Sequence, residues 1–324
     1  MSEIPYVIFT VFSQTAVGAL IAVLIADFLA KGNEDAQFFE TGAWVPVPVA
    51  VIGMIAMLSH EARPLQAMMT MNTNLATSWL SREVLALTSF VILAVIYTVL
   101  WLFEPSYGSL KWFPVIPKIT EKFMALRKPV GILGALAGLG YLGVSARSYM
   151  MLGMPAWNQP STVLYFLVTS LLVGVTAVAA VLSVKYLVKK KEAGKPFTSF
   201  LWATVGIVLV MVVVLGVALY SNITMVPLAG TEAARSAQDA AREDMLAGEH
   251  APFLWLRVVI GIGLVLVCLA ALAVALVKNS IAKASFMVML VFACAFIGEI
   301  LGRIVFFGAN VPLGEVIPCV LSSL

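Results

Sequence analysis

Long apolar runs alternate with short polar connections along the whole chain. A membrane-spanning helix needs about 20 predominantly apolar residues, and eight stretches of this kind can be marked in the sequence. They do not show the strict alternation of apolar and polar residues that a transmembrane β-barrel requires. The predicted spans are approximately 4–28, 43–61, 83–103, 129–151, 161–187, 197–222, 252–277 and 284–308.

The composition indicates the same class of protein. Of the 324 residues, 61% are hydrophobic and only 11% are charged, and the mean hydropathy is +1.01. We therefore predict an all-α, polytopic integral membrane protein with eight transmembrane helices. Because the connections are short, residues 1–324 are predicted to form a single membrane domain. We expect membrane lipid around it and no nucleic-acid partner.

The lysines and arginines are distributed unevenly between the two sets of connections. Thirteen of the twenty fall in one alternate set, and cytoplasmic connections carry such an excess. The prediction is that both chain ends lie outside (N-out, C-out), together with the connection from His60 to Glu83. The thirteen are Lys31, Lys111, Lys118, Lys122, Arg127, Lys128, Lys185, Lys189, Lys190, Lys191, Lys195, Lys278 and Lys283.

One polar block lies between the second and third apolar runs. It reads HEARPLQAMMTMNTNLATSWLSREVL and begins at His60. Charge at a membrane boundary is unfavourable, so its concentration there indicates a function. An acid, a histidine and guanidinium groups at one membrane face suit proton-coupled chemistry on a lipid-soluble substrate. The polar side chains that close one run and open the next are His60, Glu61, Arg63, Ser81, Arg82 and Glu83.

Other intramembrane charges are predicted to lie at the same face. With a rise of about 1.5 Å per residue, Arg147 lies roughly 28 Å beyond the cytoplasmic start of its span, and Glu299 lies roughly 24 Å beyond the start of its own. The inner half should then be an apolar plug, with Asp27 and Glu104 at helix ends as its only acidic groups.

Several of these residues also have a purely structural interpretation. Glu83, at the start of a span, suits the positive end of a helix dipole. Glu299 and Arg303 are four residues apart with the acid first, a spacing that favours an ion pair within one helix. Arg147 can extend its guanidinium group to the outer interface.

Two further kinds of polar residue fit a membrane bundle. Gln14 lies within the first span and needs a hydrogen-bond partner, which a neighbouring helix or a ligand would supply. Trp44, Trp79 and Trp157 fit an aromatic belt at the outer interface.

The sequence does not favour a metal cofactor in this protein. Three cysteines, Cys268, Cys294 and Cys319, form no Cys-x-x-Cys pair, which argues against an iron–sulfur cluster or a zinc site. The two histidines, His60 and His250, are predicted at the outer boundary, which argues against a haem held between helices. No metal site is therefore expected.

Three segments resemble a known family. The opening FTVFSQTAVGALI, the block that begins at His60 and the late GEILGRIVFF are similar to the membrane anchor subunit of bacterial dimethyl sulfoxide reductase, the DmsC family of molybdopterin oxidoreductase anchors. The resemblance covers the whole chain. It implies a haem-free anchor that oxidises menaquinol in the bacterial cytoplasmic membrane. Its implied partners are an iron–sulfur subunit of ferredoxin type and a molybdopterin catalytic subunit on the extracytoplasmic side.

The residues and the resemblance lead to one site. His60 and Glu83 match the family's quinol-site histidine and glutamate, and we expect His60 to accept a quinol proton while Glu83 orients it or relays the proton. Arg63 and Arg82 either hold Glu83 ionised or bind the partner subunit. The residues expected to bind quinol or support the site are Gln14, Arg63, Ser81, Arg82, Arg147, Glu299 and Arg303. The protein would be a component of an oxidoreductase with no metal redox centre of its own.

Other functions remain open from the sequence. The anchor could work in reverse and reduce quinone for a donor enzyme of the formate dehydrogenase type. It could be a structural anchor without a ligand. A secondary transporter is also possible in principle, although its polar residues should lie nearer the middle of the bilayer. The terminal acceptor, the quinone type and the direction of electron flow are not determined.

Overall fold

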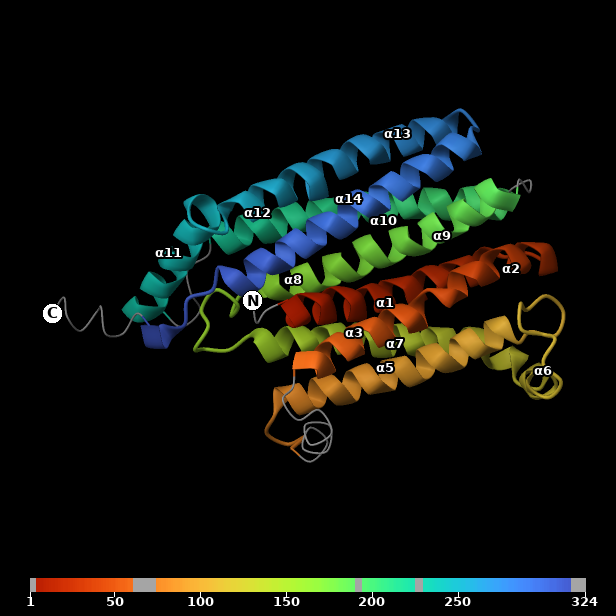
Figure 1. The fold of residues 1–324 in the computed structure, drawn as a ribbon, viewed down its shortest axis with the longest axis horizontal. Helices are drawn as coiled ribbons and strands as arrows, with labels where there is room; N and C mark the ends of the chain where they lie inside the picture. Colours follow the sequence, from red (N-terminus) through yellow and green to blue (C-terminus); the bar gives the residue numbers. More distant parts are fainter. Residues whose placement is uncertain (1–3, 61–73, 190–193, 225–229, 316–324) are drawn as a thin grey trace.

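The computed structural model describes residues 4–60, 74–189, 194–224 and 230–315. Within these ranges every regular element is helical, and eight helical stretches are long and apolar enough to cross a membrane. The predicted all-α architecture with eight spans is therefore confirmed. The stretches lie side by side as one elongated bundle (Figure 1).

The first four spans contain seven helical elements. The second span starts well before its predicted limit, because two short helices lead directly into it. A further short helix, α6 (Ile116–Glu121), precedes the fourth span. The elements of the spans are α1 (Ile4–Leu29), α2 (Asn33–Phe39), η1 (Glu40–Trp44), α3 (Pro46–His60), α5 (Trp79–Leu102), η2 (Met124–Leu126) and α7 (Arg127–Tyr149).

Two of the last four spans contain a π-helical segment, η3 and η4. Such segments are rare and often occur at functional sites. A separate amphipathic helix, α11 (Glu232–Ala247), lies across the end of the bundle (Figure 1). The elements of the spans are α8 (Pro160–Val168), η3 (Thr169–Val173), α9 (Gly174–Lys189), α10 (Lys195–Thr224), α12 (Ala251–Leu256), η4 (Arg257–Leu264), α13 (Val265–Val277) and α14 (Ile281–Gly308).

The third span begins four residues before its predicted start. The hydroxyl of Ser78 accepts a hydrogen bond from the backbone N–H of Ser81 at 3.2 Å, an N-cap that lets α5 begin at Trp79. Glu83 therefore lies in the second turn of α5. The expectation that Glu83 opens the span as a helix-dipole partner is wrong, because the dipole acts mainly within the first turn.

The first and fifth spans form the centre of the bundle. Helix α1 packs against α3 and α7 on one side and against η3, α9 and α14 on the other. The closest approach is at Gly18 and Gly174, where a methyl group on Gly18 would overlap the backbone carbonyl of Ser170. Small residues at such crossings allow transmembrane helices to approach closely.

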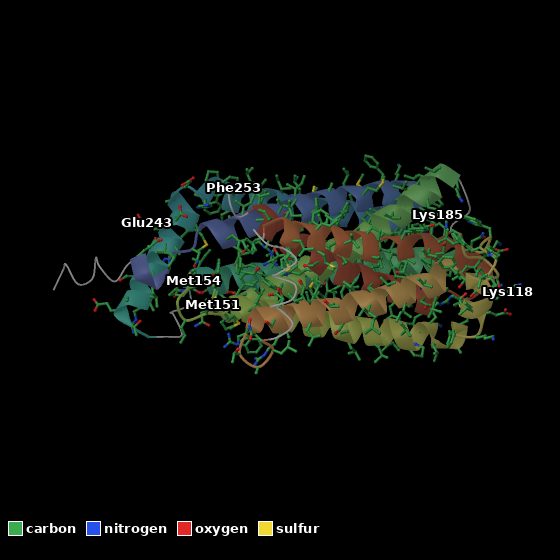
Figure 2. The ribbon with its side chains drawn as sticks, turned by 60° about the horizontal axis from the view of Figure 1, so that its bottom comes forward. Lys118, Met151, Met154, Lys185, Glu243 and Phe253 are labelled. Atoms are coloured by element: carbon green, nitrogen blue, oxygen red, sulfur yellow. The ribbon has the colours of Figure 1, made fainter. Side chains whose placement is uncertain are left out.

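The two ends of the bundle differ in their side chains. Lys118 and Lys185 lie at one end, which we call the lysine-rich end, and Met151 and Glu243 lie at the other, which we call the Glu83 end (Figure 2). Trp44 lines a depression with Lys185 at the lysine-rich end, so its expected place in the same belt as Trp79 is wrong. Which end faces the cytoplasm stays a prediction.

Candidate functional site

The carboxylate of Glu83 is enclosed in the bundle, with only 2% of the residue exposed. The hydroxyl of Ser145 donates to Glu83 Oε1 at 2.5 Å, and the hydroxyl of Ser148 donates to Oε2 at 2.6 Å. Both serines come from α7 and are three residues apart, which places them on one face of that helix. Each carboxylate oxygen therefore has one hydrogen bond and keeps capacity for another.

A second hydroxyl pair lies about one helical turn further into the bundle. The Tyr141 hydroxyl lies 2.7 Å from the Ser13 hydroxyl of α1, and both residues are fully buried. Ser13 donates its single hydroxyl proton to the Phe9 carbonyl at 2.6 Å, so Tyr141 is the donor in the pair. Polar groups of α7 thus connect α5 to α1.

The register of the helices places the end of α3 at the depth of the Glu83 carboxylate. Ser13 of α1 contacts both α7 and α3. Its hydroxyl bonds Tyr141 of α7, and a methyl group on Gly53 of α3 would lie 2.9 Å from the backbone nitrogen of Ser13. His60 follows Gly53 by seven residues, and Ser148 follows Tyr141 by seven, so each lies about 10.5 Å further along its helix. The backbone of His60 therefore lies level with Ser148.

Two predicted site residues lie partly or wholly outside the described residues. The backbone of His60 is described as the last residue of α3, but its side chain is outside the described part of the protein, as is all of Arg63. The roles of both residues stay predictions.

Arg82 does not bind Glu83. Its guanidinium group donates to the backbone carbonyls of Leu75 and Ala76, at 2.9 and 2.7 Å, and lies over the ring of Trp79. The expectation that Arg82 holds Glu83 ionised is therefore wrong. The reason is local: backbone carbonyls need hydrogen-bond partners, and two of those in the turn before α5 accept from the arginine.

Arg147 and Ser81 lie at the edge of the site. The guanidinium of Arg147 donates to the Met150 carbonyl at 2.5 Å and lies 4.9 Å from the Trp79 ring centre, and the residue is exposed at the end of α7. This agrees with the interpretation that Arg147 extends to an interface. Ser81 is buried in the first turn of α5, two residues before Glu83.

A second buried polar cluster joins α1, η3, η4 and α14. Glu299 pairs with Arg257, whose Nη2 lies 3.2 Å from Oε1, and accepts from the Thr169 hydroxyl at 2.7 Å. Arg303 donates to Gln14 Oε1 at 2.5 Å and to the Thr169 hydroxyl at 3.0 Å. The expected Glu299–Arg303 ion pair within α14 is wrong, because the carboxylate turns towards Arg257 instead.

This cluster has more donors than acceptors. It contains two guanidinium groups and one carboxylate, and among the described residues three buried donor atoms have no hydrogen-bond partner: Gln14 Nε2, Arg257 Nε and Arg303 Nη1. Buried donors of this kind are normally satisfied by protein, water or a ligand. The cluster can therefore take up an additional acceptor atom.

The lysine-rich end also contains a buried charge pair. Arg127 Nη2 lies 2.7 Å from Asp27 Oδ1, and the aspartate side chain is fully buried. Arg127 also donates to the Tyr107 hydroxyl and lies over the Trp101 ring, while Tyr97 donates to Asp27 at 3.1 Å. The apolar plug expected there is therefore only partly correct. Arg127, one of the thirteen basic residues expected in the cytoplasmic connections, is instead the first residue of α7.

Comparison with known proteins decides the family. The profile of the DMSO reductase anchor subunit (DmsC) matches residues 1–309. The protein belongs to this family. The anaerobic dimethyl sulfoxide reductase protein YnfH of Escherichia coli (strain K12) is 32% identical over 181 residues, 56% of this sequence and 57% of that protein.

Two further relatives of this DmsC-family protein match it over part of their length. The corresponding anaerobic dimethyl sulfoxide reductase protein of Haemophilus influenzae is 28% identical over 180 residues, 56% of this sequence and 58% of that protein. A sulfite dehydrogenase subunit of Allochromatium vinosum is 29% identical over 136 residues, 40% of this sequence and 38% of that protein. The protein thus spans less than two thirds of each relative.

Several residues of these polar clusters were not singled out from the sequence. A signal for some was present, since Tyr141, Ser145 and Ser148 continue a glycine pattern along α7 at alternating spacings of three and four. No comparable signal marked Thr169, because its partners come from distant parts of the sequence. Nothing in the sequence marks Arg257 as the partner of Glu299, because the two residues lie on different spans, 42 residues apart.

The described residues of this DmsC-family protein hold no cluster of metal ligands. Among them, no group of three or more His, Cys, Asp or Glu side chains is arranged to hold a metal ion. Cys268 and Cys294 are free thiols in the seventh and eighth spans.

Proposed function

We propose that this DMSO reductase anchor subunit oxidises a quinol of the menaquinol type at the Glu83 end of the bundle. The observation that carries the proposal is the buried carboxylate of Glu83, fixed by Ser145 and Ser148 at the depth where α3 ends with His60. A buried, oriented carboxylate is suited to accepting protons from a bound hydroxyl group.

The reaction separates protons from electrons. A quinol loses two protons and two electrons as it becomes a quinone. His60 accepts a hydroxyl proton, since an imidazole titrates near neutral pH. Glu83 orients the imidazole or relays the proton to the surface. The electrons pass to an iron–sulfur subunit docked at the same end.

The surroundings of Glu83 suit a flat aromatic substrate. The ring of Tyr149, next to Ser148 in sequence, contacts the ring of Phe166, and the Arg303 guanidinium lies 4.1 Å from the centre of that ring. The aromatic cluster therefore runs from the Glu83 site to Arg303 and Gln14. The unpartnered donors of Gln14 and Arg303 are available to a ligand oxygen. The further rings that contact Tyr149 belong to Trp157, Phe306 and Phe307.

The family supports the wider assignment. Its description as a DMSO reductase anchor subunit favours association with a molybdopterin catalytic subunit through the iron–sulfur subunit. On this proposal the complex lies in the bacterial cytoplasmic membrane, with its partners on the extracytoplasmic side, as the lysine distribution predicts.

Substitution of Glu83 tests the proposal. Glu83→Gln in the intact complex should lower quinol-linked turnover by about 10²-fold or more, the usual contribution of a positioned acid or base. Turnover driven by an artificial dye should persist, because the dye bypasses the site. His60→Asn should behave in the same way.

Glu104→Gln is the matched control. Glu104 is also buried and lies just beyond the opposite end of the same helix, so its loss should leave quinol-linked turnover unchanged. Unchanged quinol-linked rates in both the Glu83 and His60 variants would refute the assignment.

A second candidate function is the same site working in reverse. One relative is named a sulfite dehydrogenase subunit, and a dehydrogenase releases electrons that an anchor would deliver to quinone. The proton chemistry at Glu83 would be the same with the direction reversed. Purified complex that reduces a quinone with its partner's donor, but does not oxidise quinol with any acceptor, would favour this function.

A further inference from the structure

Helix α7 presents one face, made of small residues and Tyr141, to α1 and α5. A methyl group on Gly138 would contact Val17 of α1 and Phe90 of α5. The glycines thus bring the helices close together, and this close approach lets a short serine side chain from α7 reach Glu83 of α5. The face consists of Gly131, Gly134, Gly138, Tyr141, Ser145 and Ser148.

Ser145 and Ser148 determine how the carboxylate is oriented. Within the described part of the protein, Glu83 has no salt bridge, and these two hydroxyls are its hydrogen-bond donors. One donor on each oxygen holds the carboxylate plane in a single orientation. The remaining acceptor positions are then left for a substrate hydroxyl or for the imidazole of His60.

Ser148 has two acceptors within reach of its single hydroxyl proton. Its oxygen lies 2.6 Å from Glu83 Oε2 and 2.7 Å from the backbone carbonyl oxygen of Ser145. When Glu83 is ionised, the proton is best directed at the carboxylate, since hydrogen bonds to charged groups are stronger. When Glu83 is protonated, its new O–H needs an acceptor, and the Ser148 oxygen can serve if its own proton turns to the Ser145 carbonyl.

We propose that Ser148 is a positioning residue for Glu83 that exchanges its hydrogen-bond acceptor as Glu83 gains or loses a proton, with Ser145 holding the other oxygen. This rests on the proposed function. The step transfers one proton: a quinol hydroxyl loses it, directly or through His60, and the Glu83 carboxylate gains it as a new O–H bond. Neither protonation state then leaves a buried polar group unpaired, which would be unfavourable.

The test compares Ser148→Ala with Ser148→Thr in the intact complex. The alanine variant should lower kcat of quinol-linked turnover by about 10²-fold, the effect of a small misplacement of a catalytic group. Its KM for quinol should change little, and the midpoint of its pH profile should move. The threonine variant keeps the hydroxyl and should restore both kcat and the profile.

Infrared difference spectra give a readout that does not depend on turnover. The carboxyl band of Glu83, identified by its loss in Glu83→Gln, should shift in Ser148→Ala and keep its wild-type position in Ser148→Thr. Thr204→Val is the matched control, because Thr204 is a fully buried hydroxyl residue on α10 that bonds the Phe200 carbonyl. It should change neither the band nor the pH profile.

The outcomes separate this inference from the proposed function. Wild-type kcat, pH profile and infrared band in Ser148→Ala would overturn the role of Ser148 alone. Loss of activity in both Ser148→Ala and Ser148→Thr would also overturn it, because the hydroxyl would then not be the property that matters. Wild-type turnover in Glu83→Gln would instead overturn the function assigned to the site.

Discussion

Glu299 is held by two helical segments other than its own. Arg257 of η4 donates to both carboxylate oxygens and Thr169 of η3 donates to one of them, so one side chain joins three spans. Both charged side chains are at most 5% exposed. A buried charge is tolerated when it is paired, but loss of one partner leaves the other without compensation. Substitution of one partner alone should therefore destabilise the protein more than substitution of both.

A double-mutant cycle tests this at the scale of residues. Glu299→Gln should lower the free energy of unfolding by about 3–5 kcal/mol, because Arg257 stays charged and unpaired. The double variant Glu299→Gln with Arg257→Met should be less destabilised than the single one. Unfolding of the purified protein in mild detergent measures both.

The exposed pair of Arg242 with Asp239 on α11 is the control. Their side chains are 45% and 64% exposed, so Asp239→Asn should change stability by less than about 1 kcal/mol. Equal losses in the single and double variants of the buried pair would contradict the interpretation.

At the scale of elements, close helix crossings explain how the buried polar groups meet. The crossing of α1 with η3 and α9 depends on Gly18 and Gly174, each of which touches the backbone of the other segment. Thr169 begins η3 five residues before Gly174, and Gln14 precedes Gly18 by one turn. The glycine contact thus holds Gln14 and Thr169 near enough to share the guanidinium of Arg303.

Substitution of Gly174 tests the importance of this crossing. Gly174→Val should prevent correct packing of α1 against α9, because the added carbons would overlap the backbone of Gly18 and Ala19. The yield of monodisperse protein and the thermal midpoint in detergent should both fall. Gly216→Val on α10 should have little effect, since a methyl group there meets nothing within 4 Å. Equal yields and midpoints for the two variants would contradict the role of the crossing.

The sequence predicts the elements better than their contacts. Apolar run length alone locates all eight spans, because a bilayer imposes a length on each helix. Glu83 could be singled out because a charge near a membrane boundary is conspicuous. Its serine partners carry only a weak signal, the spacing of three and four along α7, because their role depends on the separation of two helices. The same reason explains the wrong partner for Glu299: spacing within α14 carries no information about η4.

At the scale of the whole molecule, the bundle has two polar ends of different kinds. The Glu83 end contains buried polar groups with unused hydrogen-bonding capacity, namely Glu83, Gln14 and Arg303. At the lysine-rich end, Asp27 and Arg127 satisfy each other, with tyrosine hydroxyls around them. Burial raises the pKa of the Tyr107 hydroxyl above its ordinary value, so this neighbour of Arg127 stays protonated at neutral pH. The pairing of Asp27 with Arg127 is therefore a structural contact.

Labelling of engineered cysteines tests the predicted orientation. In a variant without native cysteines, Met151→Cys should react with a membrane-impermeant thiol reagent added to intact cells, because it lies exposed at the Glu83 end (Figure 2). Lys118→Cys, at the opposite end, should react only after the cells are permeabilised. The reverse pattern would contradict the N-out, C-out prediction.

If the proposed function is correct, the pairing of Asp27 with Arg127 has a consequence for cellular energetics. If protons and electrons both depart where Glu83 lies, the subunit moves no net charge between compartments. Its turnover would then store no membrane voltage, and the free energy of the reaction would be released as heat. An organism that relies on such a complex must conserve energy earlier, at the dehydrogenase that fills the quinol pool.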